Sequence, residues 1–275
     1  MGPLIDGDDG LPATEVGEWS KQKHEFLRRY LHVSSAARKK FLKGPSKSAT
    51  FIDNFCGPGR ARVRETGEWI DGSAVAAWKI SQEGGAAFSE MFVADIDDAS
   101  RAATTERLKR LGAPVQELRG SAVDAAAAAV QKVNPHGLHF AFIDPFSLGA
   151  LDFQILQSLA SLKRIDMLIH VSKMDHQRNL GINITSEESA FDNFVPGWRD
   201  NINLNHSQQE TRRLVVEFWR EKVAELGIGP STEMRLIKGS WNQHLYWLLL
   251  AAKHKLAHKF WKVAADTDPQ GKLFD

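Results

Sequence analysis

A short apolar run, Phe51 and Ile52, ends in Asp53, and a turn that carries Gly57 and Gly59 follows it. This order is typical of a buried strand that brings its carboxyl end to a ligand. A backbone without Cβ lets a ligand approach within contact distance, and its free N–H groups can meet that ligand. The plain alternative is a turn that needs positive φ at both glycines and serves only the fold.

Further acids follow other apolar runs. One run stops at Asp95, with Asp97 close behind it, another stops at Asp144, and Ile165–Val171 is a further apolar run. Helix-like segments separate these runs, which predicts an α/β fold with a doubly wound, mostly parallel sheet and helices on both faces. The acids are then expected at the carboxyl ends of the strands, where such sheets bind ligands.

Two nucleotide-type cofactors compete for this site. A dinucleotide fingerprint would place its third glycine at Arg62, and its ribose acid about 20 residues past the turn. Asp95 instead lies 38 residues past Gly57, so NAD is disfavoured. S-adenosylmethionine fits better: the turn would face the methionine part, the acid ending the second strand would bind the ribose hydroxyls, and the strand ending at Asp144 would face the reacting group.

The second chemical candidate is the tripeptide Asp144-Pro145-Phe146. An Asp-Pro-Pro-aromatic tetrad marks methylases of amino nitrogen, in which the carboxylate and the proline carbonyl accept from the amino group while the ring stacks on the target base. Here the second proline is missing, as in a shorter form that occurs in some RNA base methylases. The alternative is a turn at the strand end that only shapes the pocket.

An ordered series of motifs resembles the three-Cys-motif partner family, TcmP, over about residues 19–262. The matching stretches are Trp19…Lys23-His24, 51–60, Asp71-Gly72-Ser73, 143–146 and 245–254. The family is similar to class I methyltransferases, so the resemblance implies a Rossmann-like, seven-stranded sheet with a C-terminal antiparallel hairpin, here from 233–238 and 243–252. It also implies a companion, a radical-type protein that carries the three cysteines.

The resulting hypothesis is S-adenosylmethionine-dependent methyl transfer to an amino group, with a nucleic-acid base as one candidate acceptor. The alternative is a non-catalytic partner, or a nucleic-acid-binding module, that keeps the methyltransferase-like fold. The residues expected to bind the cofactor are Asp53, Phe55, Gly57, Gly59, Asp95 or Asp97, and Ser121. The residues expected at the acceptor are Asp144, Pro145 and Phe146.

Helix caps offer a plainer explanation for two of these positions. Ser121 and Asp124 open a predicted helix over 121–133, where a methyltransferase contacts adenine, but an N-cap explains them equally well. Ser73 is likewise expected to cap a helix over 74–81, or, from the resemblance, to belong to a lid beside the ligand.

Composition sets the limits of the prediction. The 275 residues are 43% hydrophobic and carry one cysteine, Cys56. A full core can be buried in a single domain of this size. One cysteine excludes an internal disulfide and a multi-cysteine zinc site, and no metal site is expected. No apolar run is long enough for a membrane span and no signal-peptide pattern is present, so a cytoplasmic protein is expected.

The net charge of +1 hides an uneven distribution. Residues 1–18 are acidic and predicted to form a disordered leader. Residues 19–48 hold nine bases and one acid, and 253–262 are basic again. These ends could bind nucleic acid, or the first could be an amphipathic helix covering the sheet. The methyltransferase-like domain is expected over 49–265, with a cap over 173–205 and a flexible tail over 266–275.

Overall fold

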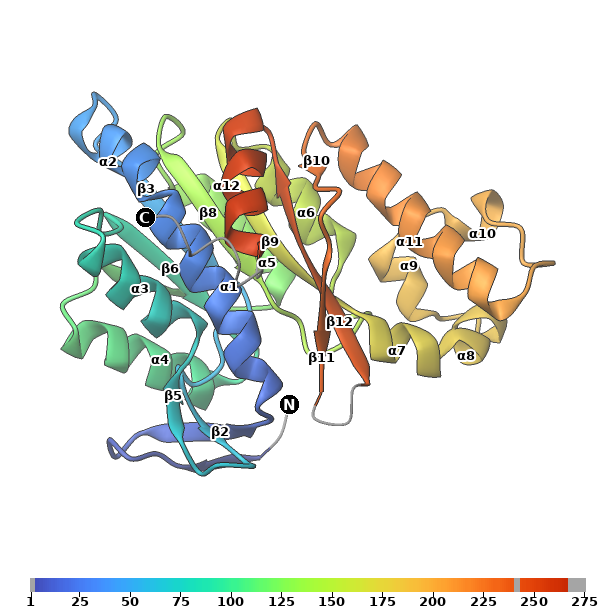
Figure 1. Ribbon diagram of the computed structural model, residues 1–275, viewed down its shortest axis with the longest axis horizontal. Helices are drawn as coiled ribbons and strands as arrows, with labels where there is room; N and C mark the ends of the chain where they lie inside the picture. Colours follow the sequence, from blue (N-terminus) through green and yellow to red (C-terminus); the bar gives the residue numbers. More distant parts are fainter. Residues whose placement is uncertain (1–2, 240–242, 267–275) are drawn as a thin grey trace.

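The computed structural model describes residues 3–239 and 243–266 and has an eight-stranded sheet at its centre (Figure 1). Five of the strands form a parallel block. In spatial order these are β7 (Val115–Leu118), β6 (Glu90–Ala94), β3 (Ala49–Asp53), β8 (Leu138–Ile143) and β9 (Ile165–Ser172). The chain runs outward in one direction from β3 and in the other from β8. The expected doubly wound α/β sheet is confirmed, with its switch point between β3 and β8.

The strands alternate their side chains between two hydrophobic cores because both sheet faces are covered. On β8, Phe140 and Phe142 belong to one core, and Ala141 and Ile143 to the other. The first core lies under α1 (Trp19–Val33), α3 (Ser73–Glu83), α4 (Asp98–Arg110) and α12 (Lys255–Ala265). The second lies under α5 (Ala122–Lys132), α6 (Phe153–Ala160) and α11 (Gln208–Glu225).

The far edge of the sheet is antiparallel. β12 (His244–Ala252) pairs with β9, and both β10 (Gly229–Pro230) and β11 (Arg235–Lys238) pair with β12. Residues 240–242, between β11 and β12, lie outside the described part of the chain. The sheet therefore has eight strands, and the predicted count of seven is wrong because the short β10 was not recognised in the sequence.

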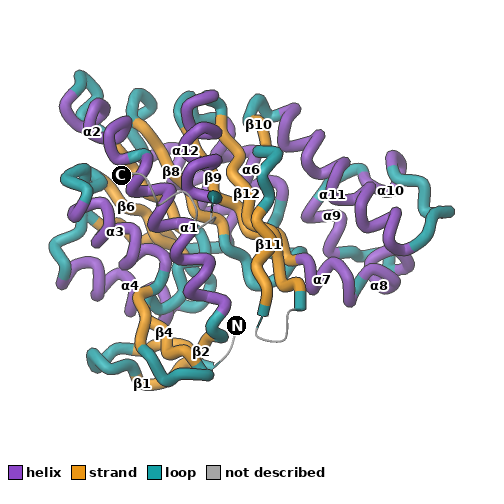
Figure 2. Tube along the Cα trace, in the orientation of Figure 1, coloured by secondary structure: helices purple, strands orange, loops and turns teal. Residues whose placement is uncertain are grey.

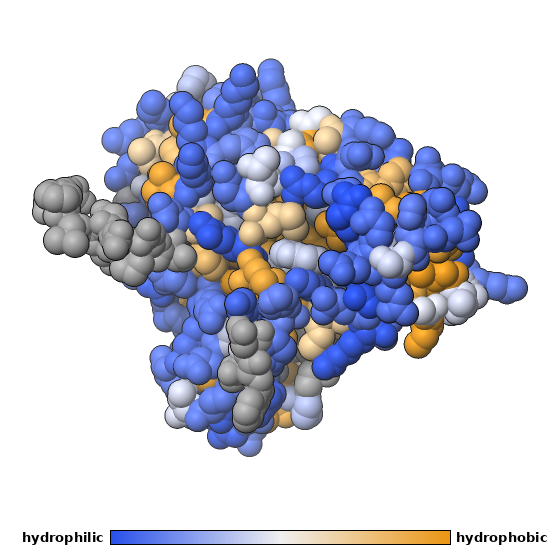
Figure 3. Space-filling model, turned by 45° about the vertical axis from the view of Figure 1, so that its right-hand side comes forward, coloured by the Kyte–Doolittle hydropathy of each residue, from blue (hydrophilic) through white to orange (hydrophobic). Residues whose placement is uncertain are grey.

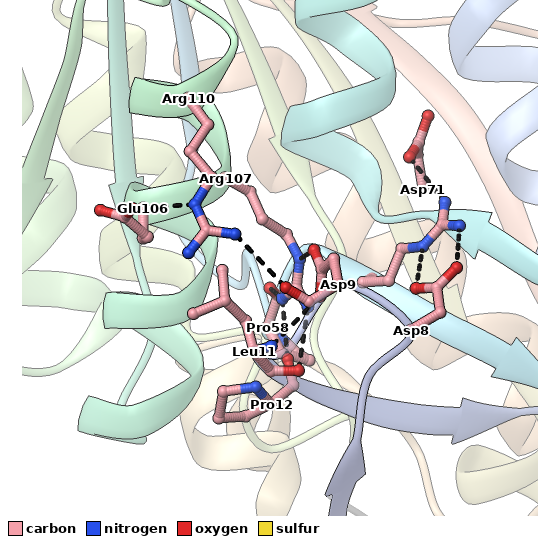
Figure 4. Close-up of polar contacts among 10 residues, drawn as sticks. Asp8, Asp9, Leu11, Pro12, Pro58, Asp71, Glu106, Arg107 and Arg110 are labelled. Carbon is pink, nitrogen blue, oxygen red and sulfur yellow. Dashed lines mark hydrogen bonds and ion pairs between the residues drawn. The ribbon is translucent and has the colours of Figure 1, made fainter.

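The acidic leader is an ordered part of a second sheet, so the prediction of disorder is wrong for residues 4–16. This sheet contains β1 (Leu4–Asp6), β2 (Pro12–Val16), β4 (Arg60–Val63) and β5 (Trp69–Asp71). Three acids of the leader form ion pairs: Asp8 with Arg60, Asp9 with Arg107 (Figure 4), and Glu15 with Arg62. Composition suggested disorder because these arginines lie far along the chain.

The basic extension forms α1 and α2 (Ser35–Lys43). In Figure 2, α1 lies across the sheet, and its buried face includes Leu27, Tyr30 and Leu31. This helix is thus the amphipathic cover that the sequence offered as one of two interpretations. It also carries a buried cation, Lys23, on the face that contacts the sheet.

The predicted cap segment consists of four short helices after β9. They are α7 (Lys173–Arg178), α8 (Leu180–Thr185), α9 (Ala190–Phe194) and α10 (Trp198–Asn201). Phe194 stacks on Trp219 of α11, with ring centroids 5.2 Å apart. No described helix is long and apolar enough to cross a membrane. Of the predicted flexible tail, residues 267–275 lie outside the described part of the chain.

Candidate active site

Three carboxyl groups lie at the carboxyl ends of adjacent parallel strands. Asp53 ends β3, Asp95 follows β6, and Asp144 follows β8. β3 lies between the other two strands, so Asp53 is central, and the charges of both neighbours raise its pKa. The three acids that the sequence predicted at strand ends therefore lie at one end of the sheet, on both sides of the switch point between β3 and β8.

Asp53 is a buried carboxyl with no cationic partner among the described residues. It accepts hydrogen bonds from the backbone N–H of Phe55 at 3.1 Å and from the Ser73 hydroxyl at 2.5 Å. Burial raises the pKa of Asp53 to about 7 because the charged form loses its water. Ser73 is not the cap predicted from the sequence: the N-cap of α3 is Gly72, and Ser73 contacts Asp53 instead.

The two glycines of the turn differ in their surroundings. Gly57 has φ +54°, a Cβ there would meet nothing within 4 Å, and its N–H donates to Asp95 Oδ2 at 2.9 Å. Gly59 has φ +80°, and a Cβ there would lie 2.7 Å from Thr104 Oγ1. Gly57 therefore faces open space, whereas Gly59 packs against α4. The turn also enters β4 directly and not a helix, since α3 begins only at Ser73.

Asp95 and Asp97 have different environments. Asp95 is buried and accepts from the backbone N–H groups of Gly57 and Asp97. Burial raises the pKa of Asp95, and these two hydrogen bonds oppose the shift. Asp97 is the N-cap of α4 and accepts from the N–H of Ser100 at 2.7 Å. An ionised carboxylate has about four lone-pair sites, so Asp95 keeps the capacity to accept two more hydrogen bonds.

Ser121 caps α5, as one of the two sequence interpretations expected. Its hydroxyl and the Asp124 side chain form a reciprocal capping box. The start of α5 is tied to the end of β3, because the Asn54 amide donates to the carbonyl of Ala122 at 2.8 Å. Asn54 Oδ1 is buried and has no hydrogen-bond partner among the described residues.

Asp144 is bound by two side chains that the sequence analysis did not place near it. Lys23 of α1 forms an ion pair with its Oδ2, and His170 Nδ1 of β9 lies 2.5 Å from its Oδ1. Burial acts to raise the pKa of Asp144, but the Lys23 charge and the His170 hydrogen bond hold it well below its usual range. The Tyr246 ring packs on His170, with centroids 3.8 Å apart.

The Asp144–His170 pair leaves one imidazole nitrogen free. Burial lowers the pKa of His170 despite the nearby carboxylate, so the ring is neutral near pH 7. A neutral ring that donates from Nδ1 to Asp144 presents a lone pair at Nε2. Nε2 is buried and has no hydrogen-bond partner among the described residues. An aspartate that orients a histidine in this way is the usual arrangement of a general base.

The face of the molecule drawn in Figure 3 is mostly hydrophilic. Two large apolar side chains near these acids are exposed. Ile96, next to Asp95, is 73% exposed, and Phe146 is 66% exposed. Pro145 and Cys56 are buried, and burial raises the pKa of the Cys56 thiol. The Phe146 ring is thus accessible to a ligand, whereas the Cys56 thiol is not.

The two basic segments, 19–48 and 253–262, meet at the amino ends of the parallel strands, opposite to the end that carries Asp144. Residues of α2 and of 253–260 line one cavity of about 550 Å³ over the amino ends of β8 and β9. The bases that line it are Arg38, Lys40, Lys163, Arg164 and Lys253. Asp144 lies at the other end of β8, about 20 Å away along a strand of this length. A nucleic acid bound at the basic ends would have to extend that far to reach Asp144.

No family model matches the chain, and no curated protein matches it. Similar solved structures include protein LPL1258 from Legionella pneumophila, with 8% identity, a TM-score of 0.48, and coverage of 83% of this chain and 84% of that one. The O-methyltransferase from Bacillus cereus in complex with SAH has 13% identity, a TM-score of 0.44, and coverage of 84% and 81%. The methyltransferase domain of bacterial CtHen1 has 12% identity, a TM-score of 0.40, and coverage of 82% and 99%. These likenesses are too distant to assign an activity.

Proposed function

We propose that this protein is an S-adenosylmethionine-dependent methyltransferase. The observation that carries the proposal is a pair of buried acids at the carboxyl ends of β3 and β6, Asp53 and Asp95, that form no ion pair with any described residue. An uncompensated buried carboxylate is costly, and both pKa values are raised accordingly. A ligand with an ammonium group, a sulfonium centre and ribose hydroxyls supplies the charge and the donors that these acids lack.

The residues around the turn would hold such a ligand. Asp53 and the open face of Gly57 would bind the methionine end, with Phe55 beside them. Asp95 would accept from the ribose hydroxyls, because Asp97 is engaged as a helix cap. The adenine would lie near the exposed Ile96 and the start of α5 at Ser121. When bound, S-adenosylmethionine supplies an electrophilic methyl group.

Asp144 and its partners would then act on the acceptor. Asp144 orients His170 through Nδ1, and His170 Nε2 takes the proton that an amino acceptor loses. The exposed Phe146 ring would stack on a planar acceptor such as a nucleic-acid base, with Pro145 fixing the turn. In the proposal the protein works beside the three-Cys-motif radical-type companion that the family resemblance implies.

A non-catalytic partner is the second candidate, and one observation favours it. Lys23 occupies the second oxygen of Asp144, which an acceptor amino group would otherwise contact. Asp144→Asn separates the two candidates. A methyltransferase should keep S-adenosylmethionine binding and lose about 100-fold or more in methyl transfer, whereas a scaffold should retain its partner binding and its biological activity.

Calorimetric titration tests the proposal at its first step. The wild-type protein should bind S-adenosylmethionine and S-adenosylhomocysteine with a one-to-one stoichiometry, and NADH should give no saturable heat. Binding of NADH in preference to both adenosyl ligands, or no binding of either by folded protein, would contradict the assignment. Label transfer from methyl-tritiated S-adenosylmethionine to total RNA then tests the nucleic-acid acceptor.

A further inference from the structure

A second cavity, of about 540 Å³, lies between α7, α11 and the β11–β12 edge. These elements lie side by side in Figures 1 and 2. Its volume falls in the range of small-molecule sites, about 300–1,000 Å³. Its basic lining residues are Lys173, His176, Arg212, Arg213 and Arg220, and the one acidic lining residue is Glu217. The cavity is separate from the carboxyl groups at Asp53 and Asp95, none of which lines it.

Glu217 pairs with Arg213 and forms no ion pair with the other described arginines of the lining, although its charge also acts on Arg220. Its carboxylate accepts two hydrogen bonds from Arg213 Nη1, at 2.5 and 2.6 Å, on the exposed side of α11. Arg213 is paired with Glu210 as well. The other two arginines, Arg212 and Arg220, form no ion pair with a described residue.

Buried donor atoms of both arginines lack acceptors. Arg212 Nη2 donates to Gln208 Oε1 at 3.0 Å, but Arg212 Nε is buried and has no partner in the described chain. Arg220 Nη2 donates to the carbonyl of Ser231 at 2.9 Å, whereas its Nη1 is buried and unpartnered there. Burial lowers the pKa of Arg220. Both arginines are partly exposed as residues, but a buried N–H group without an acceptor is costly, and an anion would satisfy it.

A buried imidazole adds a third unsatisfied group on the opposite wall. His176 of α7 is 1% exposed, and neither ring nitrogen has a hydrogen-bond partner among the described residues. Burial, with the Arg212 charge as a second cause, lowers the pKa of His176 to about 4, so the ring is neutral and carries one N–H. Side chains from two helices thus leave donors unpaired around the same cavity.

We propose that this cavity is an anion site that binds a ligand with more than one phosphate group, held by Arg212 and Arg220 with His176 as a neutral donor. Phosphate suits the arrangement because guanidinium groups bind its oxygens with two parallel hydrogen bonds. Arg212 and Arg220 are eight residues apart on one helix, about 12 Å along its axis. That separation fits a ligand with more than one anionic group, such as a diphosphate or two successive phosphates of a nucleic-acid strand.

The site lies at the same end of the sheet as Asp144, on the other face of β12. Trp247 lines the cavity, whereas the preceding residue, Tyr246, packs on His170. Lys173 lies over the Trp247 ring, 4.9 Å from its centroid. A phosphate bound here would therefore lie at the same end of the sheet as Asp144, with β12 between it and His170. The proposal concerns binding alone and does not depend on methyl transfer.

Titration with pyrophosphate tests the site in the full-length protein. Saturable binding is expected, and Arg212→Gln and Arg220→Gln should each weaken it by about tenfold or more, because each removes a charged hydrogen bond. Lys222→Gln is the control, since that lysine lies on the same helix outside the cavity and pairs with Glu225, and it should stay within about twofold of the wild type. Circular dichroism establishes that each variant is folded.

A second ligand distinguishes a nucleic acid from a free phosphorylated compound as the molecule that carries the phosphate. A ten-nucleotide single-stranded RNA that competes with pyrophosphate would assign the site to a nucleic acid, and failure to compete would assign it to a free phosphorylated compound. Either result keeps the anion site. The proposal would be overturned if folded wild-type protein showed no saturable pyrophosphate binding. It would also be overturned if Arg212→Gln and Arg220→Gln bound pyrophosphate as tightly as the wild type.

Discussion

Lys23 and Asp144, which are 121 residues apart in the chain, form a buried ion pair between α1 and the carboxyl end of β8. The side chains are 9% and 14% exposed, so water screens the pair weakly. This contact joins the N-terminal helix to the candidate active site. It explains why a basic residue of an apparently solvent-facing helix is buried.

Lys23→Met should destabilise the protein by about 3–5 kcal/mol at pH 7, because it leaves the Asp144 carboxylate buried without its cation. The loss should shrink below about pH 4, where Asp144 of the variant is protonated. Urea unfolding at several pH values measures both effects. Lys21→Met is the control, since Lys21 pairs with an exposed glutamate, and should cost less than about 1 kcal/mol. Equal losses for the two variants would show that the buried pair contributes nothing.

Asp53→Asn should make stability less dependent on pH. In the wild type the folded-state pKa of about 7 exceeds the ordinary aspartate pKa of 3.8, so the folded protein binds the proton more tightly. Stability is therefore lost as pH rises from about 4 to about 7, by at most about 4 kcal/mol at 1.36 kcal/mol per pKa unit. The variant should be more stable than the wild type at pH 8 and similar at pH 4. Thermal unfolding across this range, without ligand, is the measurement; parallel pH curves would contradict the raised pKa.

The glycines of the turn should respond differently to alanine. Gly57→Ala adds a methyl group in open space at φ +54°, with an expected cost of about 1–2 kcal/mol. Gly59→Ala adds the same backbone strain and also places Cβ 2.7 Å from Thr104 Oγ1 and 3.2 Å from Thr104 Cα. The second variant should be clearly less stable in urea unfolding. A Gly57 variant that is as destabilised as the Gly59 variant would mean that both positions are packed.

Arg107→Gln should loosen the N-terminal hairpin. The Arg107 side chain is 5% exposed, pairs with Asp9 and donates to the carbonyls of Pro12 and Pro58, so it connects β2 to the glycine turn (Figure 4). Hydrogen exchange of the β2 amides should become faster while exchange in α5 stays unchanged. Lys109→Gln, at an exposed position of the same helix, should leave both rates unchanged. Protection of β2 in the Arg107 variant would show that the strand ladder alone holds the leader.

The sequence predicted the features that depend on short stretches of chain. An apolar run followed by an acid was enough to locate Asp53, Asp95 and Asp144, because strand burial and strand polarity follow from local pattern. The N-cap at Ser121 could also be predicted, since Ser121 and Asp124, the two members of its capping box, are three residues apart. These features need no knowledge of distant contacts.

The features that failed all depend on distant contacts. Lys23 and His170 reach Asp144 only because α1 lies across the sheet and β9 lies beside β8, and no spacing in the sequence encodes that meeting. The leader was predicted to be disordered because its acids were counted without the arginines at 60 and 107 that pair with them. The charge composition of a segment does not show which residues elsewhere in the chain will form ion pairs with it.

The central claim is that Asp53 and Asp95, the buried acids at the carboxyl ends of β3 and β6, bind S-adenosylmethionine. A comparison of Asp95→Asn with Asp97→Asn tests it most directly. Asparagine is as good a helix cap as aspartate, so Asp97→Asn should titrate with S-adenosylhomocysteine as the wild type does. Asp95→Asn should bind about tenfold more weakly or worse, because it removes the charged acceptor of the ribose hydroxyls. Equal affinities for all three proteins, or a loss confined to Asp97→Asn, would contradict the account.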